Sequence, residues 1–171
     1  RFLGVHATHE GFRFAVWAPN AAEVSVVGDF NDWEVRKNHL SLLGDVGIWV
    51  GEVPQAKQGD LYKFAIRNQD DSIFHYKADP FGQLHQQPPD TASVIYRSSF
   101  KWNDQQWLAN RKQAQHVEKP ISIYELHLGS WRHVGEKSSL YRDIALPLVE
   151  YVKHCGFTHV EFLPLKHHPF Y

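Results

Sequence analysis

The chain has 171 residues, of which 43% are apolar and 22% are charged, and its formal net charge is −1. This balance is typical of a folded globular protein and argues against a disordered chain. A nearly neutral chain offers no broad basic surface for nucleic acid, and no apolar run reaches the length of a membrane span, so we expect neither as a partner.

Residues 11 to 97 read as a series of short β-strands. Phe12, Phe14 and Val16 alternate with smaller or polar residues, which is the period of a half-buried strand. The runs 23–27, 48–50, 61–68, 73–78 and 92–96 predict further strands.

Turn signals separate these runs at intervals of roughly ten residues, which is typical of an immunoglobulin-like β-sandwich. We therefore predict a mainly β fold with such a sandwich over residues 1–97. In the run 61–68, Tyr62, Phe64 and Ile66 should share one face. Trp17 and Trp49 lie inside strands and are expected in the core, because a small sandwich needs large side chains to fill it.

Residues 98–119 are polar and lack a clean apolar stripe, so we interpret them as a connector. A short helix over 105–115 is compatible with Trp107 and Leu108 as anchors. Pro120 should end it, because proline disfavours helix at the residue before it.

Residues 120–171 predict a strand, a helix and a second strand. The run 121–128 carries bulk on both faces, as in a strand that is covered on two sides. Apolar residues then recur every four positions, which predicts a helix: Leu140, Ile144, Leu148 and Val152. Pro147 lies inside this run and conflicts with the prediction, because a proline in a helix interior removes a hydrogen bond and kinks the axis.

Gly156 is suited to the C-terminal end of this helix, and the run 158–165 predicts the second strand. One βαβ unit cannot bury both faces of its strands, so further repeats are expected. The sequence also begins at Arg1 and contains no methionine. For both reasons we expect it to be a piece of a longer protein.

The stretch GDFNDW, residues 28–33, raises a specific question, because it places Phe30 and Trp33 among turn-forming residues. Either these aromatic side chains fold back onto the core, or they present a face to a ligand such as a sugar ring. Phe30 is the better candidate for the core.

Neither metal nor catalytic chemistry is indicated. The histidines His154, His159, His167 and His168 do not have metal-ligand spacing. Glu125 and Glu161 fall inside the two late strands, where a structural role is favoured over a catalytic pair. We expect no cofactor, no metal and no catalytic residue in this chain. The single cysteine, Cys155, and the lack of a secretory signal pattern favour the cytoplasm.

Three stretches together resemble one enzyme family. FAVWAPNAAEVSVVGDFNDW is similar to the entry of carbohydrate-binding module family 48, and LYKF, ADPF and PDTAS resemble its later landmarks in branching enzymes. PISIYELHLGSWR and GFTHVEFLPLKHHPF resemble the first and second barrel strands of 1,4-α-glucan (glycogen) branching enzymes. The resemblance runs from about Gly11 to Phe170.

The resemblance implies a sandwich followed by a truncated start of a catalytic (β/α)₈ barrel, with residues 120–171 as its first βαβ unit. It implies a transferase of glycogen biosynthesis that cleaves an α-1,4 bond and transfers the chain to a 6-hydroxyl. The catalytic carboxylates of the family belong to later strands, so this chain alone should be inactive. His167 stands where relatives usually have a glutamate.

The resemblance also implies a binding site for α-1,4-glucan, including glycogen and maltooligosaccharides. Trp33 and Lys63 match glucan contacts of related modules, and Phe74 or Tyr76 is the candidate for a second binding aromatic. Exposed strand edges in the barrel segment also favour self-association.

Three alternatives remain open. The chain could be a stand-alone glycogen-targeting module, a docking domain without a sugar site, or a fragment of a debranching or trehalohydrolase relative.

Overall fold

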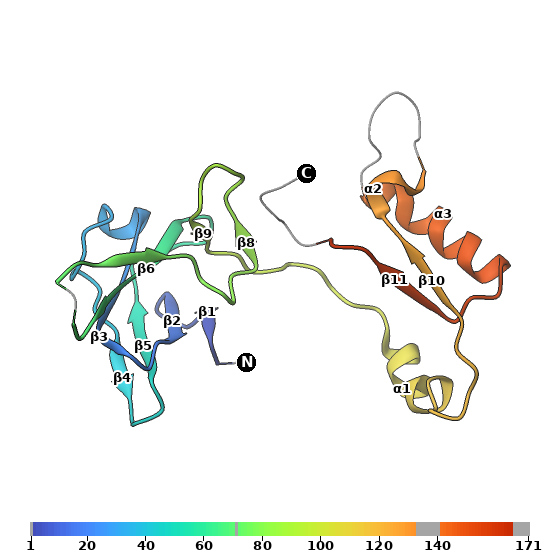
Figure 1. Ribbon diagram of the computed structural model, residues 1–171, viewed down its shortest axis with the longest axis horizontal. Helices are drawn as coiled ribbons and strands as arrows, with labels where there is room; N and C mark the ends of the chain where they lie inside the picture. Colours follow the sequence, from blue (N-terminus) through green and yellow to red (C-terminus); the bar gives the residue numbers. More distant parts are fainter. Residues whose placement is uncertain (1, 71, 133–140, 166–171) are drawn as a thin grey trace. The chain divides into compact units, whose positions relative to one another are not determined.

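The computed structural model describes residues 2–70, 72–132 and 141–165 (Figure 1). His167 and His168 lie outside these residues. The chain forms two compact units, Arg1–Phe100 and Lys101–Tyr171, which are described separately.

The first unit contains two antiparallel sheets. Its elements are β1 (Gly4–Ala7), β2 (Phe12–Trp17), β3 (Ala21–Gly28), the 3₁₀ helix η1 (Asp29–Asn31), β4 (Ser41–Leu43), β5 (Ile48–Val53), β6 (Leu61–Asn68), β7 (His75–Lys77), β8 (Leu84–His85) and β9 (Ser93–Val94). One sheet has the order β1-β2-β5-β4, and the second has the order β3-β6-β9-β8, with β7 also paired to β6. The prediction of a mainly β sandwich is confirmed, and β1, β4 and β8 are additions to the predicted strands.

The core of this unit lies between the two sheets. Phe14 of β2 meets Tyr62 of β6 edge to face, with ring centroids 5.1 Å apart, and Tyr62 meets Phe64 in the same way at 6.0 Å. All three side chains are fully buried. The predicted alternation in β6 is therefore confirmed, because its even-numbered positions supply the core.

The prediction for Trp17 is wrong, since this side chain is 61% exposed. Strand alternation explains the error: Val16 points inward, so its neighbour Trp17 must point to the opposite face. The Trp17 indole donates instead to the Val46 carbonyl oxygen, at 3.2 Å. Trp49 does pack against the core, and its indole donates to the carbonyl oxygen of Ala18.

The second unit contains the predicted βαβ arrangement. Its elements are α1 (Gln105–Ala114), β10 (Ile123–Leu126), α2 (Leu128–Trp131), α3 (Tyr141–His154) and β11 (His159–Phe162). β10 and β11 are parallel, in a register that pairs Ile123 with His159. Helix α3 runs alongside these strands (Figure 1) and packs Ile144, Leu148 and Val152 against Leu126.

Helix α3 continues through Pro147, so this proline does not end the helix although it conflicts with the helical pattern of the sequence. Gly156 follows the helix with φ of 78°, a left-handed conformation that suits glycine, and Phe157 N donates to the Val152 carbonyl oxygen. Among the residues described, no helix is both long enough and apolar enough to cross a membrane.

Candidate functional site

The turn after β3 is fixed by the buried side chain of Asn31. Its Oδ1 accepts from Gly28 N at 2.9 Å, while its Nδ2 donates to the Val26 carbonyl oxygen and to Asn38 Oδ1. The side-chain amide of Asn31 therefore connects β3, the turn and the segment after the turn by hydrogen bonds. This explains why an asparagine occupies the middle of the GDFNDW stretch.

The two aromatic side chains of this turn have different environments. Phe30 packs on the core, with its ring centroid 5.7 Å from that of Phe14. Trp33 is half-buried and follows Asp32 out of the turn. The question raised by the sequence thus has two answers: Phe30 fills the sandwich, while Trp33 keeps part of its ring accessible.

The backbone at Trp33 is held in an unfavourable conformation. Asp32 and Trp33 have φ values of 56° and 60°, a left-handed region that a bulky residue rarely adopts. Each such residue costs on the order of 1–3 kcal/mol, and such strain tends to persist at functional sites. Trp33 N donates to the Gly28 carbonyl oxygen, which helps to hold the conformation.

Asp29 fixes the indole ring of Trp33. Its Oδ1 accepts from Trp33 Nε1 at 3.1 Å, and its Oδ2 accepts from Leu61 N at 2.8 Å. Because Leu61 begins β6, the indole is tied through one carboxylate to the second sheet. The ring is therefore oriented before any ligand arrives.

The second sheet has a face that points away from the core. Since Tyr62 and Phe64 point inward, their neighbours in β6 point outward. In the register of β3 with β6, Val27 lies opposite Lys63, Ser25 opposite Ala65, and Glu23 opposite Arg67, while Ala65 also pairs with Tyr76 of β7. We call the face formed by these seven residues the outer face.

The centre of the outer face is made of small side chains. Ser25, Val27 and Ala65 are fully buried by their longer neighbours. Lys63 is half-buried, and its ammonium donates to Thr91 Oγ1 at 2.7 Å. Lys63 lies at the same end of the sheet as Trp33, because Gly28, which accepts from Trp33 N, pairs with Tyr62.

Phe74 and Tyr76 differ in accessibility. The Arg36 guanidinium lies over the Phe74 ring, 5.4 Å from its centroid, and Phe74 is half-buried. Tyr76 is 49% exposed and lies opposite Ala65 on the outer face. Arg36 thus occupies one face of the Phe74 ring, whereas the Tyr76 ring is more open to solvent.

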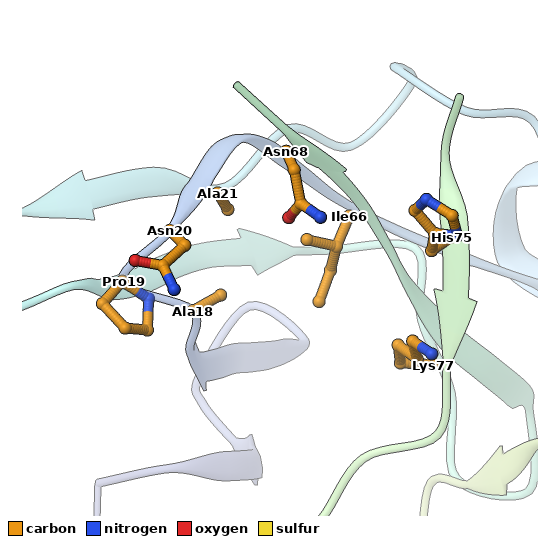
Figure 2. A pocket seen from close by; sticks show the side chains of 8 residues that line it. All are labelled: Ala18, Pro19, Asn20, Ala21, Ile66, Asn68, His75 and Lys77. Carbon is orange, nitrogen blue, oxygen red and sulfur yellow. The ribbon is translucent and has the colours of Figure 1, made fainter. Parts of the chain in front are cut away.

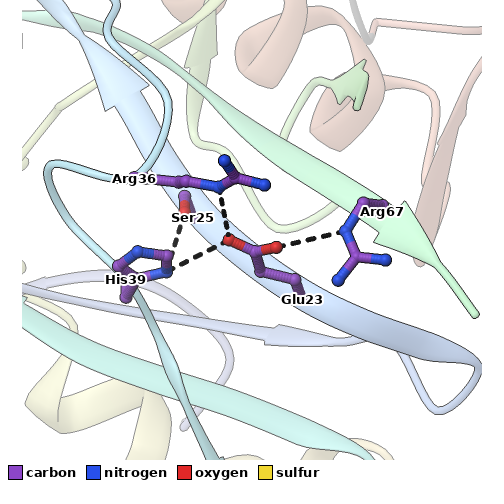
Figure 3. Close-up of polar contacts among 5 residues, drawn as sticks. All are labelled: Glu23, Ser25, Arg36, His39 and Arg67. Atoms are coloured by element: carbon purple, nitrogen blue, oxygen red, sulfur yellow. Dashed lines mark hydrogen bonds and ion pairs between the residues drawn. The ribbon is translucent and has the colours of Figure 1, made fainter. Parts of the chain in front are cut away.

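A charged cluster forms one end of the outer face (Figure 3). Glu23 accepts from Arg36 Nε and Arg67 Nε, each at 3.1 Å, and lies 3.5 Å from His39 Nδ1. Burial opposes ionisation of Glu23, but the hydrogen bonds from Arg67 and Arg36 outweigh it, so the pKa of this carboxyl lies below its usual range. The carboxylate therefore stays charged and holds Arg36 in place.

The carboxylates of β10 and β11 lie close together in the sheet. Glu125 and Glu161 are neighbours in the β10–β11 register, and both are exposed. Among the described residues, no group of three or more histidine, cysteine or carboxylate side chains is placed to hold a metal ion.

The sequence-predicted site residues all belong to the second sheet or to the loops beside it. Lys63 and Trp33 lie at one end of β6, and Phe74 precedes β7, near Arg67 at the other end. Lys63 and Arg67 are four positions apart in β6, which corresponds to about 13 Å. Sequence reasoning missed Arg36 and Glu23, because only the strand register and the path of the loop bring them together.

Comparisons with known proteins show which proteins this chain resembles. Residues 2–82 match the family model of carbohydrate-binding module 48 (isoamylase N-terminal domain). The chain is 43% identical over 174 aligned positions to the 1,4-alpha-glucan branching enzyme GlgB of Francisella philomiragia, covering 98% of this chain and 27% of that protein. It is 45% identical to the same enzyme of Methylococcus capsulatus, covering 99% and 24%. The chain thus spans about a quarter of these relatives.

Solved structures support the fold. A putative alpha amylase from Salmonella typhimurium superposes with a TM-score of 0.67 at 20% identity, covering 96% of this chain and 25% of that one. PulA from Klebsiella pneumoniae, crystallised with maltotriose, gives a TM-score of 0.65 at 20% identity and covers 95% and 20%. At this identity the likeness establishes the fold alone.

Proposed function

Residues 2–82 form a carbohydrate-binding module 48 domain, and the chain matches the N-terminal part of glycogen branching enzymes; from this premise we propose that the outer face binds α-1,4-glucan. The observation that carries the proposal is the Trp33 indole, which has a strained backbone, is bonded to Asp29 and lies at the same end of the sheet as Lys63. A strained and oriented aromatic at the end of a sheet is more consistent with ligand contact than with packing.

The chemistry of the outer face suits a sugar chain. An aromatic ring provides a flat apolar surface for one face of a pyranose, while neighbouring polar groups bind its hydroxyls. Trp33 supplies the flat surface, and the Lys63 ammonium supplies donors. Ser25 and Ala65 in the centre are fully buried, so a sugar chain on this face contacts the longer side chains around them, Lys63 and Tyr76.

A second aromatic contact comes from the region of β7. Phe74 has one face covered by Arg36 and therefore offers only part of its ring. Tyr76 is more exposed and lies opposite Ala65 in the centre of the outer face. We assign the main stacking role to Tyr76 and a supporting role to Phe74, which also positions Arg36.

Replacing Trp33 with alanine tests this function. We expect the dissociation constant for maltoheptaose, measured by calorimetry on the full chain, to rise at least about tenfold, because buried tryptophans often dominate binding energies. Trp33→Phe should retain part of the affinity, since it keeps a flat ring. Trp17→Ala is the matched control, because Trp17 is exposed on the other sheet.

Two results would contradict the proposal. Equal affinity in the Trp33→Ala and wild-type chains would remove Trp33 from the site. No heat of binding from the wild-type chain at millimolar maltoheptaose would overturn glucan binding itself.

We further propose that a full-length protein containing this chain is a 1,4-alpha-glucan branching enzyme like the relatives it matches, and that it transfers α-1,4-glucan chains to 6-hydroxyls. The family resemblance implies that the catalytic carboxylates belong to barrel strands later than β10 and β11. The 171-residue chain should therefore leave the iodine colour of amylose unchanged on incubation. A shift of the absorption maximum to shorter wavelength would show branching and contradict this assignment.

Residues 120–171 are proposed to begin the catalytic barrel. Ile121 and Ile123, before and within β10, and Val160 and Phe162 of β11 are exposed, which is unusual for a parallel sheet. In the longer protein, further strands and helices would cover them. The second unit and its parallel strands also favour an enzyme over a stand-alone targeting or docking module, and the single cysteine favours the cytoplasm.

In the isolated chain we propose that these uncovered strands cause self-association. Light scattering should give an apparent mass above that of the monomer that increases with concentration. Ile123→Lys should shift the chain toward monomer, whereas Val46→Lys, an equally exposed position in the first unit, should not. A wild-type chain that stays monomeric at every concentration would refute this proposal.

A further inference from the structure

A cleft opens at the edge of the first unit, on the side of β7 opposite the outer face (Figure 2). Its volume is about 430 Å³, within the usual range of roughly 300–1,000 Å³ for small-molecule sites. It is lined by Ala18, Pro19, Asn20 and Ala21 from the turn between β2 and β3, Ile66 and Asn68 of β6, and His75 and Lys77 of β7.

The strand register places this cleft and the outer face on opposite sides of β7. His75 pairs with Ile66, and Lys77 pairs with Phe64, so both lie on the core side of the sheet. Tyr76 lies between them and points to the outer face. Among the described strands, β7 pairs only with β6, so a ligand can reach both of its sides around the free edge.

The lining of the cleft combines an apolar base with polar groups around it. Figure 2 shows the side chains of Asn20, Asn68 and Lys77 arranged around Ile66. Within the described part of the chain, these three polar side chains have no hydrogen-bond partner. They are therefore available to a ligand without the loss of an existing contact.

The type of ligand follows from these groups. A side-chain amide both donates and accepts, which matches hydroxyl groups, and the apolar base suits the face of a sugar ring. The described residues that line the cleft include no carboxylate, so they do not indicate a metal cation. One lysine and one histidine beside two neutral amides do not form an anion site of the kind built from clustered arginine and lysine side chains.

We propose that this cleft binds the end of a second α-glucan chain. One chain of a branched glucan then contacts the outer face, and the second chain contacts the opposite side of β7 in the cleft. The inference rests on the proposed function of the outer face. It adds a separate subsite formed by Asn20, Asn68 and Lys77. The lining of the cleft is confined to the turn 18–21 and to short parts of β6 and β7, so the cleft takes the end of a chain, whereas the outer face takes the middle.

Two ligands distinguish the two sites in the full chain. Maltotriose has free ends and can enter the cleft, whereas β-cyclodextrin is a closed ring of the same α-1,4-linked glucose. In ¹⁵N nuclear magnetic resonance spectra, maltotriose should shift the side-chain amide signals of Asn20 and Asn68 together with the Trp33 indole signal. β-Cyclodextrin should shift the Trp33 signal alone.

Substitution gives an independent test. Asn68→Ala/Lys77→Ala should weaken maltoheptaose binding about fivefold and leave β-cyclodextrin affinity unchanged, consistent with the loss of two hydrogen bonds. Gln58→Ala, which removes an exposed amide in a distant turn, should change neither.

The failures can be told apart. If maltotriose moves the Trp33 signal but not the two amides, or if the double variant binds both ligands like wild type, the cleft subsite is refuted and the outer face stands. If neither ligand moves any of these signals, the proposed function fails and the cleft subsite fails with it.

Discussion

Gly28→Ala should destabilise the first unit by about 3 kcal/mol, at the upper end of the usual cost of overpacking. A Cβ at this position would overlap the Leu61 carbonyl oxygen and lie 2.8 Å from the Phe30 ring. Neither obstacle can move easily, because Leu61 begins β6 and Phe30 packs on the core. The backbone at Gly28 is extended, with φ of 177°, so the cost comes from close approach and not from backbone strain.

The same substitution should disrupt the glucan site. Gly28 N binds Asn31, and its carbonyl oxygen accepts from Trp33 N. If β3 and β6 separate at this end, Asp29 also loses Leu61 N, and the indole is no longer oriented. We therefore expect weaker maltoheptaose binding as well as lower stability.

Hydrogen exchange of the β3 and β6 amides is the appropriate measurement, because it reports on the first unit alone. Gly59→Ala is the control, since Gly59 has φ of 100° and open space around it. It should cost about 1–2 kcal/mol through backbone strain only. A Gly28→Ala chain that is as stable as Gly59→Ala would contradict the packing argument.

The fold was largely predictable because alternation reports directly on burial. Phe12, Phe14 and Val16 predicted one face of β2, and Tyr62 and Phe64 predicted one face of β6. The error at Trp17 came from weighing its size above its place in the same alternation. Strand β1 was missed because Gly4–Ala7 is short and has no strong pattern of its own.

The candidate site was only partly predictable. Trp33 and Lys63 follow from the resemblance, and the outward position of Lys63 follows from the alternation in β6. The contact of Arg36 with Phe74 depends on the path of a long loop, and the pairing of Glu23 with Arg67 depends on register. Neither can be read from one sequence, because a shift of one residue would exchange the faces.

The polar centre of the sandwich was also absent from the sequence reasoning. Asp79 is 1% exposed. Its Oδ2 accepts from the Tyr62 hydroxyl at 2.7 Å, and its Oδ1 accepts from Phe81 N at 2.8 Å. Asp79 N in turn donates to Ser93 Oγ, which lies 3.2 Å from His85 Nδ1. This network joins β6, β8 and β9, and it explains why the ADPF stretch leads into β8.

Asp79→Ala should lower the free energy of unfolding by about 3 kcal/mol, because it leaves the buried Tyr62 hydroxyl without an acceptor and also removes the acceptor of the partly buried Phe81 N. Asp79→Asn should cost only about 1 kcal/mol, since it keeps the shape and one acceptor. The additional change Tyr62→Phe should recover part of the loss in Asp79→Ala, because it removes one of the two unsatisfied donors. Hydrogen exchange of the β6 amides measures all three variants.

The pH dependence gives a second readout. Burial raises the pKa of Asp79 above its ordinary value of 3.8, and the hydrogen bonds from Tyr62 and Phe81 only partly offset this. The folded state therefore binds more protons than the unfolded state between 3.8 and the raised pKa. As pH rises through this window, the wild-type chain should lose stability relative to Asp79→Asn, and above it the difference should be constant. A difference that changes in the opposite direction would show that the carboxylate is stabilised by its partners more than burial penalises it.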